Sequence, residues 1–257
     1  MTTAKSTRLR RRRRFRGALV VAAASACRIR APLLSDVDTI ERVGLPVGIK
    51  RRVNGGPDRL KLNIFEKMYV NSPAHTISQI RNVSFLRKLH ALPAGSRVVE
   101  IGCGRGVGMQ LILRVFEPAS AEALDIDPKM IRLTQQRLHA VPSERVKVQL
   151  ADVHRLPYPD GSIDAVFDFG VLHHLEEWRT GLAEVARVLP EGGHFYIEEY
   201  FPALYANAFF GRLLAHPTED RFHAEEFKKA LAEERLTMLA GYAESKFRLL
   251  GVAVKKR

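Results

Sequence analysis

The stretch of sequence that decides the fold is VVEIGCGRG, residues 98–106. Its apolar residues flank one acidic residue and give way abruptly to alternating glycines. This pattern predicts a buried parallel strand, a tight turn and a helix over about 107–116. Because glycine has no Cβ, such a turn lets backbone N–H groups approach a ligand at the helix N-terminus.

The spacing of the glycines narrows the choice of ligand. A dinucleotide-binding turn has its third glycine five positions after the first, but Val107 occupies that position here and the third glycine is Gly106. Glu100 lies just before the turn, where a carboxylate would repel a diphosphate and would suit a ligand with an ammonium group. The pattern therefore disfavours an NAD-dependent oxidoreductase.

Strand-like and helix-like segments alternate along the rest of the chain. We expect strands at 98–101, 122–126, 146–150, 165–169 and 194–198, and helices at 128–139, 176–189 and 224–234. Asp127 before Pro128 is a typical helix start. Such alternation predicts a parallel sheet wound on both sides by right-handed crossovers. Two strand-like runs at 237–242 and 247–254 are joined too closely for a crossover, which predicts an antiparallel last strand.

The basic residues are concentrated at the N-terminus. The net charge is +13, but residues 1–34 hold ten Lys and Arg and no acid, which leaves 31 basic against 28 acidic residues, or +3, for the remainder. We expect a disordered basic arm and linker over 1–58. The arm loosely resembles a twin-arginine export signal, it could contact RNA or anionic lipid, or it has no role in the fold.

The remaining residues, 59–257, form the predicted main domain. Helices are expected over 59–92, because Ile77, Ile80, Val83 and Leu86 recur at every third position. An aromatic-rich cap is expected at 200–220, as a cover for an apolar or aromatic substrate or as a core or dimer contact.

Side chains that could hold a ligand follow the predicted strands. Asp125 closes the second strand and could accept both hydroxyls of a ribose. Asp152 follows the third strand and could accept a hydrogen bond from an adenine amino group, with Val153 beside the ring. Ligands of doubly wound sheets bind at these carboxyl ends, where the winding reverses.

The order and spacing of several motifs resemble those of class I S-adenosylmethionine-dependent methyltransferases, most closely the branch with ubiquinone/menaquinone C-methyltransferases. The motifs are the glycine turn, ALDIDP at 123–128, Ala151-Asp152, LPYP at 156–159 and RVLPEGG at 187–193. This resemblance implies a Rossmann-like α/β fold, with a doubly wound, mostly parallel seven-stranded sheet, an antiparallel last strand and an N-terminal helical extension.

The resemblance also implies S-adenosylmethionine as the cofactor and a set of residues around it. Glu100, Gly102, Cys103, Gly104 and Gly106 would receive its methionine part, with Cys103 as a small filler. Asp125 would bind the ribose. Ile126, Asp152 and Val153 would surround the adenine, and Phe169 would lie near the sulfonium.

The methyl acceptor is less well defined by the sequence. His174, and less strongly His173, follow the fourth strand and could remove a proton from an acceptor. Phosphoethanolamine-type methyltransferases have a histidine at the place of His174, aided by a tyrosine for which Tyr69 is the candidate. Alternatively, one of the histidines caps the next helix. We expect a small-molecule acceptor, apolar or aromatic, such as a quinone precursor or a lipid.

Composition excludes several other classes. Two cysteines leave no CxxC metal site, so we expect no metal. No apolar run is long enough to cross a membrane, and we expect a cytoplasmic protein. The rival functions are RNA methylation through the basic arm and non-catalytic cofactor binding. The sequence does not indicate the oligomeric state.

Overall fold

The structure, a computed structural model, describes residues 73–204 and 221–257, with side chains from Thr76 onward. The chain divides into two compact units, Met1–Arg52 and Val53–Arg257, and the described residues all belong to the second. The expected arm, Tyr69 and most of the expected cap therefore lie outside the described residues.

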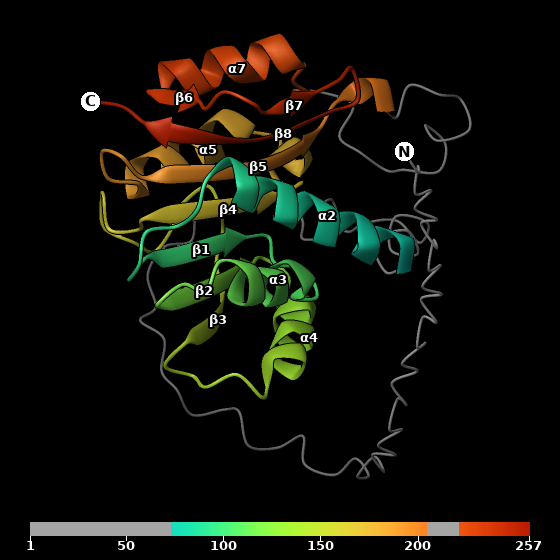
Figure 1. Ribbon diagram of the computed structural model, residues 1–257, viewed down its shortest axis with the longest axis vertical. Helices are drawn as coiled ribbons and strands as arrows, with labels where there is room; N and C mark the ends of the chain where they lie inside the picture. The colour runs from blue at the N-terminus through green and yellow to red at the C-terminus, as the bar shows by residue number, and fades with distance from the viewer. Residues whose placement is uncertain (1–72, 205–220) are drawn as a thin grey trace, which may run out of the picture. The chain divides into compact units, whose positions relative to one another are not determined.

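The described elements alternate as the sequence predicts (Figure 1). The helices are α2 (Pro73–Leu89), α3 (Val107–Val115), α4 (Pro128–Leu138), α5 (Trp178–Val188) and α7 (Ala224–Glu233), with short 3-10 turns η1 (Leu172–His174) and η2 (Pro202–Leu204). The strands are β1 (Arg97–Ile101), β2 (Ser120–Asp125), β3 (Val146–Leu150), β4 (Ala165–Phe169), β5 (His194–Tyr200), β6 (Leu236–Met238), β7 (Ala243–Glu244) and β8 (Arg248–Lys255).

These strands form one mixed sheet in the order β3-β2-β1-β4-β5-β8-β6. Neighbours from β3 to β5 are parallel, whereas β8 runs antiparallel to both β5 and β6. The predicted fold class is confirmed, with one addition: the two-residue β7 pairs with β8 across the tight turn near Ser245. The winding reverses between β1 and β4, so the fold places any ligand site at the carboxyl ends of these two strands.

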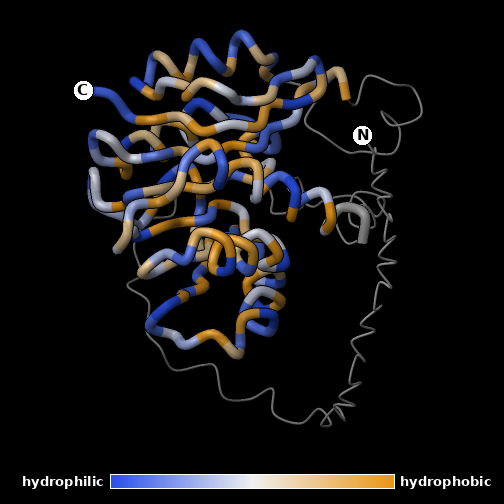
Figure 2. Tube along the Cα trace, in the orientation of Figure 1, coloured by the Kyte–Doolittle hydropathy of each residue, from blue (hydrophilic) through white to orange (hydrophobic). Residues whose placement is uncertain are grey.

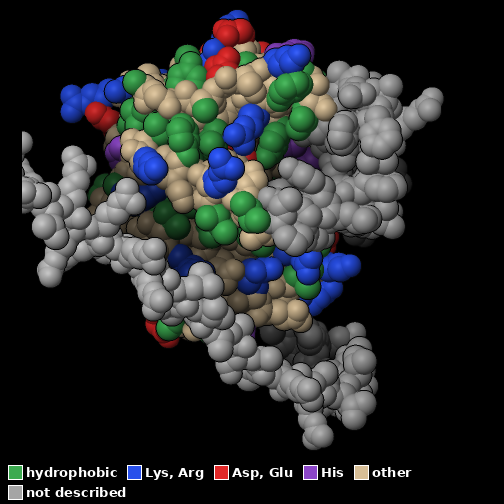
Figure 3. All heavy atoms as spheres, turned by 45° about the vertical axis from the view of Figure 1, so that its right-hand side comes forward, with side chains coloured by type: hydrophobic (Ala, Val, Ile, Leu, Met, Phe, Trp, Pro, Cys, Tyr) green, Lys and Arg blue, Asp and Glu red, His purple; other side chains and the backbone are tan. Residues whose placement is uncertain are grey.

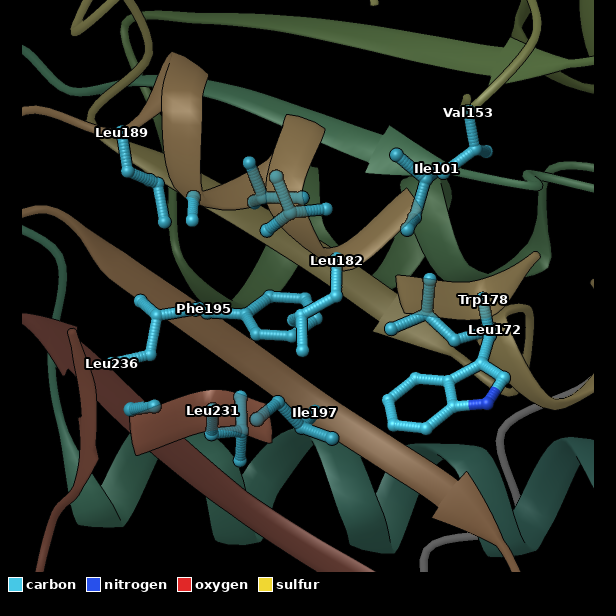
Figure 4. Close-up of a cluster of buried hydrophobic side chains, with 14 of the residues drawn as sticks. Ile101, Val153, Leu172, Trp178, Leu182, Leu189, Phe195, Ile197, Leu231 and Leu236 are labelled. Atoms are coloured by element: carbon cyan, nitrogen blue, oxygen red, sulfur yellow. The ribbon is translucent and has the colours of Figure 1, made fainter. Parts of the chain in front are cut away.

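Apolar side chains fill both faces of the sheet. One cluster packs α5 and α7 against the strands, and it contains Trp178, Leu182 and Phe195 (Figure 4). The other packs α2, α3 and α4 against the opposite face. Figure 2 shows apolar segments recurring along the strands. Because both faces of the central strands are covered, Glu100 is the one polar side chain that β1 buries, and Arg97 at its start is exposed.

The apolar stripe expected on α2 is only half correct. Val83 and Leu86 are buried, but Ile77 and Ile80 are 59% and 45% exposed. A helix turns about 100° per residue, so a repeat of three falls about 60° short of a full turn at each step. Over three steps the stripe moves to the opposite side of the helix, and only its C-terminal half packs on the sheet.

Candidate functional site

The glycine turn connects β1 to α3 with three residues in the left-handed region. The φ angles of Gly102, Gly104 and Gly106 are 58°, 53° and 76°, which residues with a Cβ adopt only at a cost. A Cβ on Gly102 would lie 2.3 Å from the Val171 side chain, and one on Gly106 would lie 2.8 Å from Thr134. At Gly104 a Cβ would meet no atom within 4 Å, so this glycine faces open space.

Side chains of helix α4 donate hydrogen bonds to the backbone carbonyls of the glycine turn. The Thr134 hydroxyl donates to the Gly104 carbonyl at 2.9 Å, and its oxygen lies 3.6 Å from Cys103 Sγ. The Arg137 side chain donates to the Arg105 carbonyl at 2.7 Å. Cys103 itself is buried in the turn. The sequence analysis missed Thr134, since nothing near it in the chain points to the turn.

Glu100 is the most unusual side chain near the turn. It is 2% exposed, and its Oε2 has no hydrogen-bond partner among the described residues. Burial raises the pKa of Glu100 well above its usual value, and Asp125 and Asp168 raise it further by repulsion. An uncompensated buried carboxyl is costly, and a cationic group beside Oε2 would remove that cost. The site therefore fits an ammonium-bearing ligand and disfavours an anionic one.

Gly108 and Phe169 close the space around Glu100. A Cβ on Gly108 would lie 1.9 Å from Glu100 Oε1 and 2.7 Å from the Phe169 ring. The first turn of α3 can therefore approach the carboxylate only because residue 108 is glycine. Phe169 is half-buried and packs on Phe167, with ring centroids 6.1 Å apart.

Asp125 at the end of β2 ties this strand to the glycine turn. Its two carboxylate oxygens accept the backbone N–H groups of Gly104 and Asp127, each at 2.8 Å. Burial raises the pKa of Asp125, although those N–H bonds oppose the shift. The next residue, Ile126, is 48% exposed, so an apolar side chain borders the carboxylate.

The two candidates after β3 differ in exposure. Asp152 is exposed, and its Oδ1 lies 2.9 Å from the His154 amide nitrogen and 2.7 Å from His154 Nδ1. Val153 is buried in the core cluster that includes α5. The Ala151 amide donates to the Asp125 carbonyl at 3.0 Å, so this segment adjoins the end of β2.

The two histidines lie in η1, directly after the carboxyl end of β4. Their ring centroids are 4.1 Å apart. His173 Nδ1 lies 2.6 Å from Glu199 Oε2, a carboxylate on β5 that is 0% exposed. Glu198, its neighbour on the other face of β5, accepts hydrogen bonds from Asn82 and Tyr200, each at 2.6 Å.

Sequence reasoning missed the carboxyls of β4 and β5. Asp168, Glu198 and Glu199 are all buried within otherwise apolar strands. A charged residue in such a strand was the available signal, and only Glu100 was interpreted in that way.

Part of the expected cap is described. Phe201 is buried in the core cluster, and its ring lies edge-on to that of Phe222 with centroids 6.3 Å apart. In the described residues no group of three or more His, Cys, Asp or Glu is placed to hold a metal ion. Within the same ranges none of the helices combines the length and apolar character needed to cross a bilayer.

Comparisons with known proteins identify what this chain is similar to. Residues 99–197 match the family model described as a methyltransferase domain. The fatty-acid O-methyltransferase of Mycolicibacterium smegmatis is 34% identical over 57% of this chain and 46% of its own length. The phthiotriol/phenolphthiotriol dimycocerosates methyltransferase of Mycobacterium leprae is 29% identical over 62% of this chain and 50% of its own.

The chain thus spans about half the length of the curated relatives it matches. Among solved structures, a SAM-dependent methyltransferase from Aquifex aeolicus superposes with a TM-score of 0.58 over 74% of this chain and 95% of its own, at 18% identity. That likeness concerns the fold.

Proposed function

We propose that the protein is a class I S-adenosylmethionine-dependent methyltransferase that methylates a lipid-like small molecule, because residues 99–197 match the methyltransferase-domain model and the similar proteins are methyltransferases. The observation that carries this proposal is Glu100, a buried carboxyl with an unpartnered oxygen beside a glycine turn. S-adenosylmethionine carries an ammonium group on its methionine part, and a carboxylate is the partner that such a group requires.

Different residues of this chain would bind different parts of the cofactor. When bound, S-adenosylmethionine supplies an electrophilic methyl group on a sulfonium. Glu100 and the glycine turn would hold the methionine part, with Cys103 beneath it. Asp125 would accept hydrogen bonds from the ribose hydroxyls, with Ile126, Asp152 and Val153 around the adenine and Phe169 near the sulfonium.

The protein's main task in such a reaction is alignment. Holding the nucleophile in line with the methyl carbon and excluding water can lower a barrier by about 7–11 kcal/mol. An acid–base residue adds a factor of about 10²–10⁴ only when the acceptor must lose a proton. The histidine pair 173 and 174 is our candidate for that task, and the sequence favours His174.

The substrate class rests on the relatives. The names of the two similar proteins refer to fatty acids and to phthiotriol dimycocerosates, and the sequence independently favours an apolar acceptor. We place the reaction in the cytoplasm, since the methyl donor is cytosolic. A contact of the basic arm with nucleic acid or anionic membrane concerns residues outside those described.

Calorimetry on the purified full chain tests the cofactor assignment. We expect S-adenosylhomocysteine to bind at one site, and NAD to give no heat, because the carboxyls of Glu100 and Asp125 repel a diphosphate. Clear uptake of NAD without uptake of S-adenosylhomocysteine would overturn the assignment.

A methyl-donor assay tests the acceptor class. Formation of S-adenosylhomocysteine is measured with long-chain fatty acids, hydroxylated lipids, phenols, quinone precursors and RNA, each against a blank without acceptor. Turnover confined to RNA would contradict the proposed substrate class. Cofactor binding without turnover on any acceptor would favour the non-catalytic alternative.

A further inference from the structure

Two buried carboxyls lie side by side at the carboxyl ends of β4 and β5. Asp168 pairs in register with Ile197, so Asp168 and Glu199 project from the same face of the sheet. Both are 0% exposed. They lie on the face opposite Glu100, Phe169 and Glu198, and the cofactor assignment does not use them.

The hydrogen bonds of this pair are complete except for one atom. Glu199 Oε1 accepts the Leu172 amide at 2.7 Å, and Oε2 lies 2.6 Å from His173 Nδ1 and 3.2 Å from the Tyr200 amide. Asp168 Oδ1 accepts the Val171 amide at 2.8 Å. Asp168 Oδ2 is buried and, with both carboxyls ionised, has no hydrogen-bond partner among the residues that the structure describes.

A proton on Asp168 Oδ2 would turn this atom into a hydrogen-bond donor and give it a partner. Burial and the neighbouring Glu199 charge raise the pKa of Asp168 well above its usual value. Burial raises the pKa of Glu199 to about 7, although its bond to Asp168 opposes the rise. Two carboxyls in contact cannot both ionise cheaply, and a protonated Asp168 can donate from Oδ2 to Glu199. Glu199 then remains the carboxylate that faces His173.

We propose that Asp168 and Glu199 share one proton and together hold the His173 ring with its proton on Nδ1, so that His173 acts as the base for methyl transfer to a hydroxyl oxygen. This inference rests on the proposed function. Asp168 and Glu199 are positioning residues, and His173 is the group that meets the acceptor. The arrangement is a histidine oriented through Nδ1 by a buried carboxylate, which favours proton uptake at Nε2.

The segment that carries His173 adjoins the cofactor turn. Val171, two residues before His173, packs where a Cβ on Gly102 would lie. A Cβ on Gly170 would lie 3.2 Å from His173 Cε1 and 3.3 Å from the Tyr200 ring. Residues 170–173 therefore lie between the first glycine of the turn and the end of β5, next to the expected methyl site.

The chemical step balances with these groups. The hydroxyl oxygen of the acceptor bonds to the methyl carbon, the carbon–sulfur bond breaks with its electron pair on sulfur, and the hydroxyl proton passes to His173 Nε2. The positive charge on the ring is stabilised by the Glu199 carboxylate. A carboxylate acceptor has no proton to lose, so the base predicts a hydroxyl acceptor in preference to an ionised fatty acid.

Nuclear magnetic resonance of ¹⁵N-histidine-labelled full chain tests the proposal without turnover. We expect His173, assigned by loss of its signal in His173→Gln, to be protonated on Nδ1 when neutral. Glu199→Gln should abolish that preference, because a glutamine must place its NH2 against either His173 Nδ1–H or the Leu172 amide. Asp168→Asn should keep it, because an asparagine donates to Glu199 as the protonated aspartic acid does. A mixed or Nε2–H tautomer in the wild type would overturn the proposal.

Kinetics with a hydroxylated acceptor supply the second readout. We expect His173→Gln to lower kcat about 100-fold or more with unchanged affinity for S-adenosylhomocysteine. Glu199→Gln should lower kcat at least about 10-fold and move the acid limb of the kcat–pH profile to lower pH, since the imidazolium loses its carboxylate. Within residues 73–204 and 221–257, the charged groups that contact Glu199 are Asp168 and His173, whereas Arg248 on β8 contacts Glu198 on the opposite face.

The controls separate a positioning role from a structural one. Glu198→Gln removes a carboxyl of matched burial on the same strand and should leave the acid limb in place. His139→Ala, at an exposed site after α4, should leave kcat unchanged. Loss of kcat in His174→Ala with retention in His173→Gln would assign the base to His174 and overturn the inference. Failure to bind S-adenosylhomocysteine in the wild type would instead overturn the proposed function, with the tautomer result still standing.

Discussion

At the scale of single residues, Glu100 lowers the stability of the ligand-free protein and favours the binding of a cationic ligand. Its pKa is raised by burial, so the folded protein holds a proton that the unfolded chain releases above about pH 4.3. Stability from this group therefore falls as the pH rises from about 4.3 toward the raised folded-state pKa. At neutral pH the side chain favours unfolding until a cation binds beside it.

Replacing Glu100 with Gln should thus have two opposite effects. We expect the unfolding free energy at pH 7 to rise, because a neutral amide does not carry the cost of a buried, unpartnered carboxylate. Affinity for S-adenosylhomocysteine should fall at least about 10-fold, since a charge-assisted bond is worth about 1.5–3 kcal/mol. Urea denaturation and calorimetry measure the two effects. A variant that is less stable and binds as tightly as the wild type would contradict this role.

Gly108 illustrates how one missing Cβ sets the distance between two elements. We expect Gly108→Ala to destabilise the fold by about 1–3 kcal/mol and to weaken cofactor binding, because the methyl group would overlap Glu100 Oε1. Gly251→Ala in β8 is the matched control, since its methyl would overlap Met238 and Tyr242, which the cofactor assignment does not use. Calorimetry should show unchanged cofactor affinity in the control.

At the scale of elements, Arg187 in the last turn of α5 forms hydrogen bonds to the loop at 156–160, which precedes β4. Its guanidinium donates to Glu184 at 2.7 and 2.8 Å, to Asp160 at 2.7 Å, and to the carbonyls of Tyr158 and Leu156 at 2.8 and 3.1 Å. These bonds use the planar fork of the guanidinium, which a lysine cannot reproduce. The RVLPEGG motif therefore has a structural basis in this chain.

We expect Arg187→Ala to lower the unfolding free energy by about 1.5–3 kcal/mol, the worth of bonds to a charged group. Arg187→Lys should recover less than half of this loss. Urea denaturation gives both values, and calorimetry should show cofactor affinity within about two-fold. Full rescue by lysine would show that only the charge matters.

The carboxyl pair of β4 and β5 predicts a pH dependence of stability. Both pKa values are raised in the folded protein, and that of Glu199 to about 7. The stabilisation from this pair is therefore present at low pH and is lost as the pH rises, for Glu199 between about 4.5 and 7 and for Asp168 up to its own raised pKa. Asp168→Asn removes one of the titrations and should flatten this decline, measured by urea denaturation at pH 5, 6, 7 and 8. An equally steep decline in the variant would contradict the shared proton.

At the scale of the whole molecule, the charge distribution separates lipid from RNA substrates. Outside residues 1–34 the chain carries only +3, and on the face shown in Figure 3 Lys and Arg lie scattered among apolar side chains. A protein that binds nucleic acid through several phosphate contacts loses about 10³-fold or more in affinity for it between 50 and 200 mM salt.

We expect turnover of an uncharged lipid acceptor by the full chain to change less than about two-fold between 50 and 200 mM salt. Formation of S-adenosylhomocysteine at limiting acceptor concentration is the measurement, with RNA as the parallel acceptor. A steep fall with salt would favour the RNA alternative and the basic arm as its binding segment.

The sequence by itself determined the class of the fold, and it predicted where the cofactor site lies. Strand and helix signals are local, so alternating apolar runs, Asp127 before Pro128 and the spacing of the glycines predict the sheet, its windings and its ligand-binding edge. Glu100 could be interpreted because it interrupts an apolar strand next to those glycines. The cofactor roles of the individual residues stay predictions.

The tertiary structure decided the features that depend on distant parts of the chain. Thr134 beneath Gly104, Gly108 against Glu100, and Asp168 beside Glu199 are contacts between different elements. The helix face of α2 is another, since a repeat of three does not say which turns meet the sheet. A carboxyl's pKa and a histidine's tautomer depend on the groups within hydrogen-bond distance, and folding selects those groups by packing rather than by their order in the chain.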